Sequence, residues 1–231
     1  MASHPYIAEA AALIGDPARA NMLLALMDGR ALTATELAII AGVSPSTASE
    51  HLTKLASGQL VSVFPSGRHR YYRLASRGVA ETLESLMNLA ATGPKRIRPR
   101  SPCDSATARA RTCYDHFAGG LGVGLADRLI ARGLVILAED GGIVTDEGLA
   151  FLSEAGIVAD EPQGSRRPFC RPCLDWSERR WHIGGSLGAA IARTSFEREW
   201  TMRQRGSRAV TVTERGQKAF SQLFGLDLQK A

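Results

Sequence analysis

The chain lacks the features that mark several large classes of protein. Its 231 residues include only four cysteines and no apolar run near the roughly 20 residues that span a bilayer. Residues 1–12 have neither a basic start nor a long apolar core, so we expect no secretory leader. Four cysteines are too few for a secreted disulfide framework. These absences exclude the membrane-spanning and disulfide-framework classes, and we expect a cytoplasmic, nucleoid-associated globular protein.

A strong overall charge is also missing, but the charges are unevenly distributed. Residues 1–93 balance at seven basic and seven acidic residues, whereas 94–111 carry six basic residues and one acidic residue. Residues 112–164 carry two basic and nine acidic residues, and 165–231 carry thirteen and six. Within the neutral first block, 44–77 hold five basic residues against one acidic residue. A local basic stripe is typical of a nucleic-acid-binding face, and a solvated charged surface is the alternative.

Capping residues, prolines and glycines predict three helices near the N-terminus. They cover about 16–28, the segment from Thr33 to Gly42, and 45–57. Each helix begins with a good capping residue: Asp16, Thr33 with Glu36 in a capping box, and Ser44. The second and third helices are therefore joined by a tight turn that contains glycine.

A hairpin, a further helix and a linker are predicted after these helices. Aromatic and β-branched residues flank a Pro-Ser-Gly turn over 60–74, which predicts a β-hairpin. Leucines at helical spacing predict a helix over 77–91. Proline and arginine dominate 94–104, which we interpret as a linker, with a basic arm on DNA as the alternative. The expected domains are therefore 1–93 and 105–231.

The second half of the chain contains an internal repeat. The matching segments are 116–122 with 182–188, 143–148 with 211–216, and Cys113-Tyr-Asp115 with Cys173-Leu-Asp175. We expect two helix–helix–hairpin–helix, winged-helix-like units, over about 105–160 and 170–228, with final helices capped by Thr145 and Thr213. The predicted fold class is mainly α with small β-hairpins, an α+β chain.

Three motifs within 33–74 carry a family resemblance. They are Glu36-Leu-Ala38, Gly42-Val-Ser-Pro-Ser-Thr-Ala-Ser-Glu-His-Leu-Thr-Lys-Leu55 and Gly67-Arg-His-Arg-Tyr-Tyr72. With them, about residues 8–92 resemble the winged helix-turn-helix domain of the ArsR/SmtB family of bacterial transcriptional regulators. The resemblance implies a homodimer that binds an inverted-repeat DNA operator, usually as a repressor, and it does not name an effector. The two metal-site patterns of that family are not matched, because 37–41 lack cysteine and 77–91 lack histidine.

The predicted helix over 45–57 divides into an apolar back and a polar front. Ala48, Leu52 and Leu55 share one face. Short hydroxyls near a helix N-terminus suit base edges or phosphates, and basic side chains suit phosphates. We therefore expect this helix in the major groove and the hairpin over 60–74 as a wing, the alternative being an ordinary surface helix. The predicted DNA-binding residues are Ser44, Ser46, Thr47, Ser49, Glu50, His51, Lys54, Arg68, His69, Arg70 and Tyr71. For His51, a buried and hydrogen-bonded packing role is an equal alternative.

Two short-spaced pairs offer zinc-ligand side chains: Cys113 with His116, and Cys170 with Cys173. Against a metal site stand the 53 residues between the pairs, the expected helical context of the first pair, and the repeat match of Cys113 with Cys173. We therefore expect these four residues to pack, with no cofactor. A zinc site or redox-active thiols, which would make the chain a metal- or redox-responsive sensor, is the alternative.

Catalytic patterns are scarce. Cys113, Asp115 and His116 are the residue types of a thiol active site, but adjacent residues seldom reach that geometry. The chain has no glycine-rich phosphate loop and no strand-turn-serine pattern, so we expect no enzyme. Three tryptophans lie among arginines in the second half, at 176, 181 and 200. They indicate either domain packing or a pocket for an anionic or aromatic ligand.

Overall fold

The computed structural model describes residues 5–66, 69–92, 102–159, 167–205 and 207–228. The chain divides into two compact units, 1–86 and 87–231. No helix within the described ranges is both long enough and apolar enough to cross a membrane. The predicted linker over 94–104 falls largely on residues 93–101, which lie outside the described residues.

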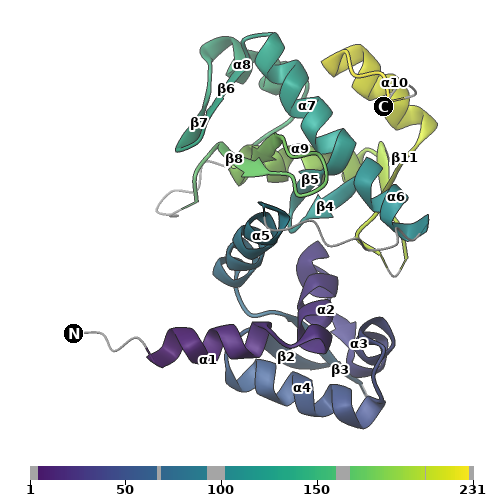
Figure 1. Ribbon diagram of the computed structural model, residues 1–231. Helices are drawn as coiled ribbons and strands as arrows, with labels where there is room; N and C mark the ends of the chain where they lie inside the picture. Colours follow the sequence, from purple (N-terminus) through teal and green to yellow (C-terminus); the bar gives the residue numbers. More distant parts are fainter. Residues whose placement is uncertain (1–4, 67–68, 93–101, 160–166, 206, 229–231) are drawn as a thin grey trace. The chain divides into compact units, whose positions relative to one another are not determined.

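The first unit is a winged helix-turn-helix (Figure 1). Its elements are α1 (Pro5–Ile14), α2 (Pro17–Ala25), the 3₁₀ helix η1 (Leu26–Asp28), β1 (Leu32–Thr33), α3 (Ala34–Ala41), α4 (Pro45–Ser57), β2 (Val61–Ser66), β3 (His69–Leu74) and the start of α5 (Arg77–Thr92). The strands form one antiparallel sheet in the order β1-β3-β2. The helices and the hairpin predicted for this region are therefore confirmed.

Local capping explains why these helices begin where they do. The Asp16 carboxylate accepts a hydrogen bond from the Arg19 N–H at 3.0 Å, and the Ser44 hydroxyl accepts one from the Thr47 N–H at 3.2 Å. Thr33 heads α3 in a reciprocal capping box. Gly42 closes α3 at a φ of +68°, a left-handed conformation that glycine adopts without strain. The sharp turn between α3 and α4 follows from that residue.

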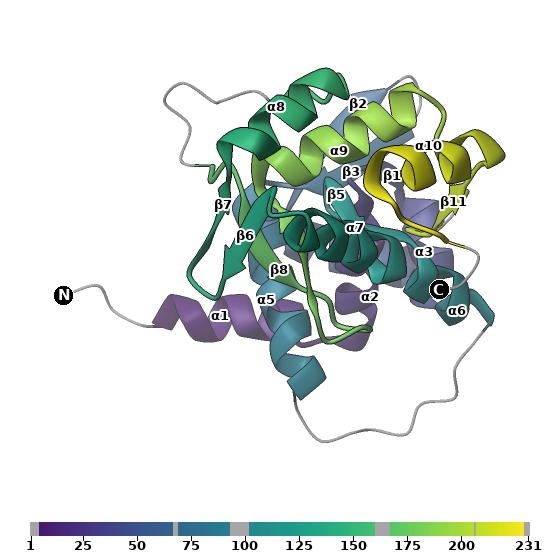
Figure 2. The ribbon, with the colours of Figure 1, turned by 90° about the horizontal axis from the view of Figure 1, so that it is seen from above.

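The second unit is a chain of hairpins and helices (Figure 2). Its elements are α6 (Pro102–Arg109), β4 (Arg111–Cys113), β5 (His116–Ala118), α7 (Gly119–Ala131), β6 (Val135–Ala138), β7 (Gly141–Val144), α8 (Asp146–Glu154), β8 (Arg171–Leu174), β9 (Trp181–Gly184), α9 (Gly185–Glu197), β10 (Thr201–Arg203), β11 (Val210–Val212) and α10 (Glu214–Phe224). From β4 to α8 and again from β8 to α10, the order is hairpin, helix, hairpin, helix.

The expected helix–helix start of each half is right for the glycine-rich helices α7 and α9 and wrong for the segment directly before each of them. Antiparallel hairpins occupy 111–118 and 171–184 instead. In the first hairpin, a two-residue loop contains Tyr114 at a φ of +59°, a conformation that ends any helix. The later hairpins, after α7 and after α9, and the caps at Thr145 and Thr213 agree with the prediction.

The two halves of the second unit share one hydrophobic core. In Figures 1 and 2, α7 and α9 lie close to β5, and each helix also packs against the hairpin of the other half, α7 on β9 and α9 on β5. Glycines allow this close approach. A Cβ added at Gly188 would lie 3.0 Å from the His116 Cβ of the other half and 2.2 Å from the Ile183 carbonyl oxygen. One at Gly122 would lie 3.4 Å from the His182 Cβ and 2.4 Å from the Phe117 carbonyl oxygen. Neither half of this unit therefore buries its apolar face alone.

A fully buried ion pair joins the two N-terminal hairpins of these halves. An Arg111 guanidinium nitrogen lies 2.8 Å from the Asp175 carboxylate, and both side chains are at most 1% exposed. The same carboxylate accepts hydrogen bonds from the N–H groups of Gly119, Ser177 and Glu178, at 2.6, 2.9 and 3.0 Å. Burial raises the pKa of Asp175, but the Arg111 charge and these hydrogen bonds outweigh it and hold that pKa well below its usual range.

We predict that Asp175→Asn destabilises the second unit by about 3–5 kcal/mol, because it leaves the Arg111 charge buried without its counter-ion. Urea unfolding monitored by tryptophan fluorescence measures this, since all three tryptophans belong to the second unit. The wild-type unit should also lose stability as the pH falls below about 3.9, the ordinary aspartate pKa, because the folded-state pKa is lower.

The matched control for that prediction is Asp127→Asn. Asp127 pairs with Arg180 at 2.6 Å, but these side chains are 41% and 59% exposed. Such a pair contributes at most about 1 kcal/mol. Equal losses of stability in the two variants would contradict the role assigned to the buried pair.

Candidate functional site

The N-terminus of α4 carries a group of hydroxyls. The Ser44 hydroxyl lies 2.9 Å from the Ser46 hydroxyl and 2.8 Å from the Thr47 hydroxyl. Ser44 and Ser46 are exposed and Thr47 is half-buried. The positive end of the helix dipole and these hydroxyls face the same end of the helix, which is an arrangement suited to phosphates and base edges.

The division of α4 into two faces is confirmed. Ala48, Leu52 and Leu55 are fully buried. Ser49, Glu50 and Lys54 are exposed. An apolar back that holds the helix in the core and a polar front that faces outward are what insertion into a groove requires. The individual DNA contacts of these residues remain predictions.

His51 faces α2 and the Asp16 cap of that helix instead of the polar front. Its Nδ1 lies 3.2 Å from an Arg19 guanidinium nitrogen, and its Nε2 lies 4.0 Å from the Asp16 carboxylate. The His51 side chain is 15% exposed. This geometry supports the packing role that was the alternative for His51, because both ring nitrogens are turned toward residues of α2 and its cap.

The wing is a regular antiparallel hairpin, in which Ser66 is paired with His69. His69 and Arg70 are exposed near its tip, and Tyr71 is half-buried with its ring centroid 6.0 Å from that of Phe64. Arg68, also predicted to bind DNA, lies outside the described residues, together with Gly67. The described part of the wing therefore offers one exposed arginine and one exposed histidine near its tip.

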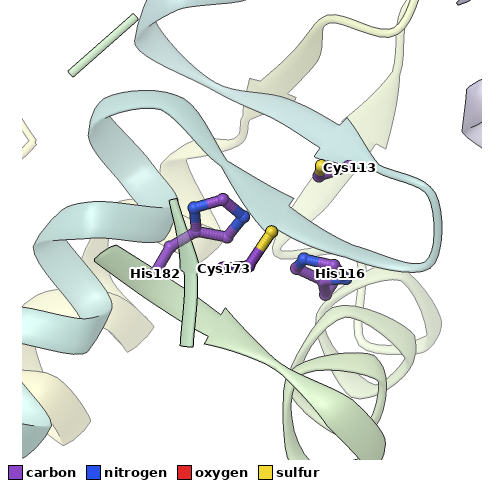
Figure 3. A group of neighbouring side chains, drawn as sticks. All are labelled: Cys113, His116, Cys173 and His182. Carbon is purple, nitrogen blue, oxygen red and sulfur yellow. The ribbon is translucent and has the colours of Figure 1, made fainter. Parts of the chain in front are cut away.

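A second constellation lies in the other unit (Figure 3): Cys113, His116, Cys173 and His182. Each hairpin contributes one cysteine and one histidine as directly opposed residues, Cys113 with His116 and Cys173 with His182. One ligand atom from each side chain lies within 4.8 Å of those of the other three. All four residues are buried, with exposures of 4%, 1%, 5% and 0% in chain order.

This grouping differs from the one considered in the sequence. Cys113 and His116 lie on a hairpin and not in the expected helix. Cys170 is not in the group, and its thiol lies against Gly142, with which it forms an isolated backbone β-bridge. Burial raises the pKa of the Cys170 thiol to about 11. The fourth member is His182. The repeat already aligned His116 with His182 and Cys113 with Cys173, so the signal was present in the sequence.

Carboxylates lie behind both imidazoles. The His116 Nδ1 is 3.3 Å from the Asp115 carboxylate, which also pairs with Arg167 at 2.8 Å. The His182 Nδ1 is 3.7 Å from the Asp175 carboxylate. Burial lowers the pKa of His182, and so do the charges of His116, Arg111 and Arg171. The Asp175 carboxylate raises this pKa by less, so the His182 ring is held neutral. The two imidazole rings stack with centroids 5.1 Å apart.

The tryptophans take packing positions. The Arg111 guanidinium lies 4.6 Å from the Trp176 ring centroid, and the Arg198 guanidinium lies 5.3 Å from that of Trp200. Trp200 is 6% exposed and stacks edge-on against Phe220 at 5.8 Å. These contacts support domain packing over a ligand pocket for the tryptophan and arginine cluster.

Comparison with solved structures finds likenesses to bacterial proteins that cover little more than a third of this chain. NolR from Sinorhizobium fredii is 28% identical over 36% of this chain and 83% of that chain, with a TM-score of 0.34. A homodimeric winged helix-turn-helix DNA-binding domain from Mycobacterium bovis, from a possible ArsR-family transcriptional regulator, is 27% identical over 37% of this chain and 78% of that chain, with a TM-score of 0.35.

Sequence comparison reaches further along the chain. Residues 14–63 match the family described as a helix-turn-helix domain. The chain is 43% identical over 217 residues to YdfF of Bacillus subtilis, an uncharacterized HTH-type transcriptional regulator, and the match covers 94% of this chain and 96% of that protein. Since the likeness extends over both units, this chain belongs to the family of HTH-type transcriptional regulators that includes YdfF.

Proposed function

We propose that this regulator is a homodimeric repressor of the ArsR type that binds an inverted-repeat operator, with α4 in the major groove and the β2–β3 hairpin on the phosphate backbone. The observation that carries the proposal is the cluster of three hydroxyls at the start of α4, those of Ser44, Ser46 and Thr47. The opposite, apolar face of the same helix is fully buried. The same proposal places the protein in the cytoplasm, at the nucleoid, and assigns it no catalytic activity.

The roles divide by chemistry. Ser46, Thr47, Ser49 and Glu50 would meet base edges, since short polar side chains near the start of a recognition helix reach them. Phosphate contacts fall to basic side chains and to residues that flank the groove: Ser44, Lys54, Arg68, His69, Arg70 and Tyr71.

The proposed dimer has a candidate surface on the helix α5. Leu89 on α5 is 68% exposed and Leu86, one turn earlier, is 39% exposed. Two large apolar side chains exposed on one face of a helix fit a surface that a second copy buries.

For the second half, we propose two copies of one ancestral unit within a domain that includes α6 and the elements after it, which shortens the predicted linker because 102–104 belong to α6. Beyond the shared element order, Thr145 and Thr213 cap equivalent helices, and each hydroxyl accepts a hydrogen bond from the N–H three residues on, Gly148 or Gly216, at 3.1 and 3.0 Å. This domain would set the geometry of the dimer or receive a signal.

Arg70→Ala should weaken binding to specific and nonspecific DNA alike and reduce the log–log salt slope by about 1, because one phosphate contact releases about one counterion. Titrations at several salt concentrations measure the slope. Arg128→Ala, which removes the same charge from an exposed site on α7, is the control. A slope that is unchanged in Arg70→Ala would remove Arg70 from the interface.

Thr47→Ala should change the preference between operator variants by about 1 kcal/mol or more, because a lost base contact affects some base pairs and not others. Competition binding with a set of single-base operator variants measures the preference. Thr53→Ala is the control on the same helix, since the Thr53 hydroxyl donates to the Ser49 carbonyl at 2.9 Å. A uniform loss across all variants would instead assign Thr47 to a phosphate.

Leu89→Glu should convert the dimer to a monomer at micromolar concentration and abolish tight operator binding, because it places a charge in the proposed interface. Sedimentation analysis measures the first effect. On the wild type, inserting five base pairs between half-sites should also abolish tight binding, since half a helical turn rotates one site away. Ile136→Glu, at an apolar residue 54% exposed on β6, is the comparison. If that variant alone dissociated the dimer, the interface would lie in the second unit.

A further inference from the structure

We propose that Cys113, His116, Cys173 and His182 bind one zinc ion that joins the two halves of the second unit. The proposal is independent of the DNA-binding function, since all four residues lie in 87–231. It replaces the expectation that the cysteines only pack, and it exchanges Cys170 for His182 in the ligand set.

The donor set and its spacing fit the ion. Two thiolates and two imidazoles are a common tetrahedral set for structural zinc, with bonds of about 2.3 Å to sulfur and 2.0–2.1 Å to nitrogen. These bond lengths give donor-to-donor distances of about 3.3–3.8 Å in a tetrahedron. The four donor atoms lie within 4.8 Å of one another, so a contraction of about 1 Å completes the coordination.

The positions of the four ligand residues on the two hairpins also indicate a metal site. Each cysteine stands directly opposite a histidine on its own hairpin, so the two hairpins present the same pair of ligands. Both histidines also lie against the other half of the unit, because a Cβ added at Gly122 on α7 would lie 3.4 Å from the His182 Cβ, and one at Gly188 on α9 would lie 3.0 Å from the His116 Cβ.

His182 supplies the second observation. It is 0% exposed, and neither of its ring nitrogens has a hydrogen-bond partner among the described residues. A buried imidazole of this kind is costly unless a further group satisfies it. A metal ion bound at Nε2 is such a group. The Asp175 carboxylate, 3.7 Å from Nδ1, would then be the carboxylate of a carboxylate–histidine–zinc arrangement.

His116 has an equivalent arrangement. The Asp115 carboxylate contacts its Nδ1 at 3.3 Å, so we assign Nε2 to the metal. Asp115 and Asp175 both follow a ligand cysteine by two residues. Two similar ligand pairs, each with a carboxylate behind its histidine, make a closed site with four protein ligands. Such sites stabilise folds and leave no open position for a substrate.

The first experiment uses the full-length chain, purified under reducing conditions with no added metal. Elemental analysis should find about one zinc per chain, and X-ray absorption at the zinc edge should find two sulfur and two nitrogen ligands. Cobalt exchanged for zinc should give the visible absorption of a tetrahedral thiolate site. Removing the zinc with a chelator should lower the melting temperature read by tryptophan fluorescence, and one equivalent of zinc should restore it.

Variants test the ligand set. Cys113→Ser and His182→Gln should each reduce the bound zinc at least tenfold. Cys170→Ser is the matched control, because Cys170 is an equally buried thiol outside the group, and it should keep about one zinc per chain. If a ligand variant does not fold, the cobalt spectrum of the wild-type chain still decides the question.

Three results would overturn the proposal. The first is wild-type protein that contains no zinc and binds neither added zinc nor added cobalt when its thiols are reduced. The second is a zinc content that falls equally in Cys170→Ser and Cys113→Ser. The third is a disulfide between Cys113 and Cys173 in the metal-free chain as isolated, which would instead make the pair a redox-active site.

Discussion

The buried contact between the hairpins β4–β5 and β8–β9 is the constraint on which the second unit depends. Arg111 on one hairpin and Asp175 in the loop of the other form an ion pair without access to water. Burying such a pair costs free energy, and separating its partners costs more. The fold therefore favours the packing of the two hairpins in which Arg111 and Asp175 stay paired. The cysteines and histidines that face one another across the same hairpins are brought together by that arrangement. The shared core and the proposed metal site therefore depend on the same packing of the two hairpins.

The first unit depends on a simpler principle. Its helices α3 and α4 each begin at a capping side chain that accepts a hydrogen bond from the N–H three residues later. The turn between them is made by one glycine, Gly42, in a left-handed conformation. The helices α2 and α3 pack against α4, whose buried Ala48, Leu52 and Leu55 leave its polar side outward. A helix fixed from behind can present Ser46 and Thr47 without changing shape on binding, which lowers the entropic cost of recognition.

These differences explain what the sequence predicted and what it did not. Caps such as Thr33 and Ser44 act within one turn, so the helices and wing of the first unit could be read directly. The hairpins around Cys113 and Cys173 depend on residues about 60 positions away, and the short strands resemble helix starts locally. The zinc alternative in the sequence paired Cys173 with Cys170, its neighbour along the chain, whereas the fold brings His182 to Cys173. His51 was ambiguous in the sequence, because only the packing of α2 brings Arg19 to its ring.

The most direct test of the central claim, that α4 and the wing read DNA, is amide hydrogen exchange on the full-length chain with and without its operator. We expect protection upon binding at the N–H groups of 44–50 and of the β2–β3 hairpin, since Ser46 and Thr47 precede the first backbone hydrogen bond of α4, from the Ala48 N–H to the Ser44 carbonyl, and would face the groove in the proposed complex. Protection confined to other segments, with 44–50 unchanged in the bound state, would contradict the account.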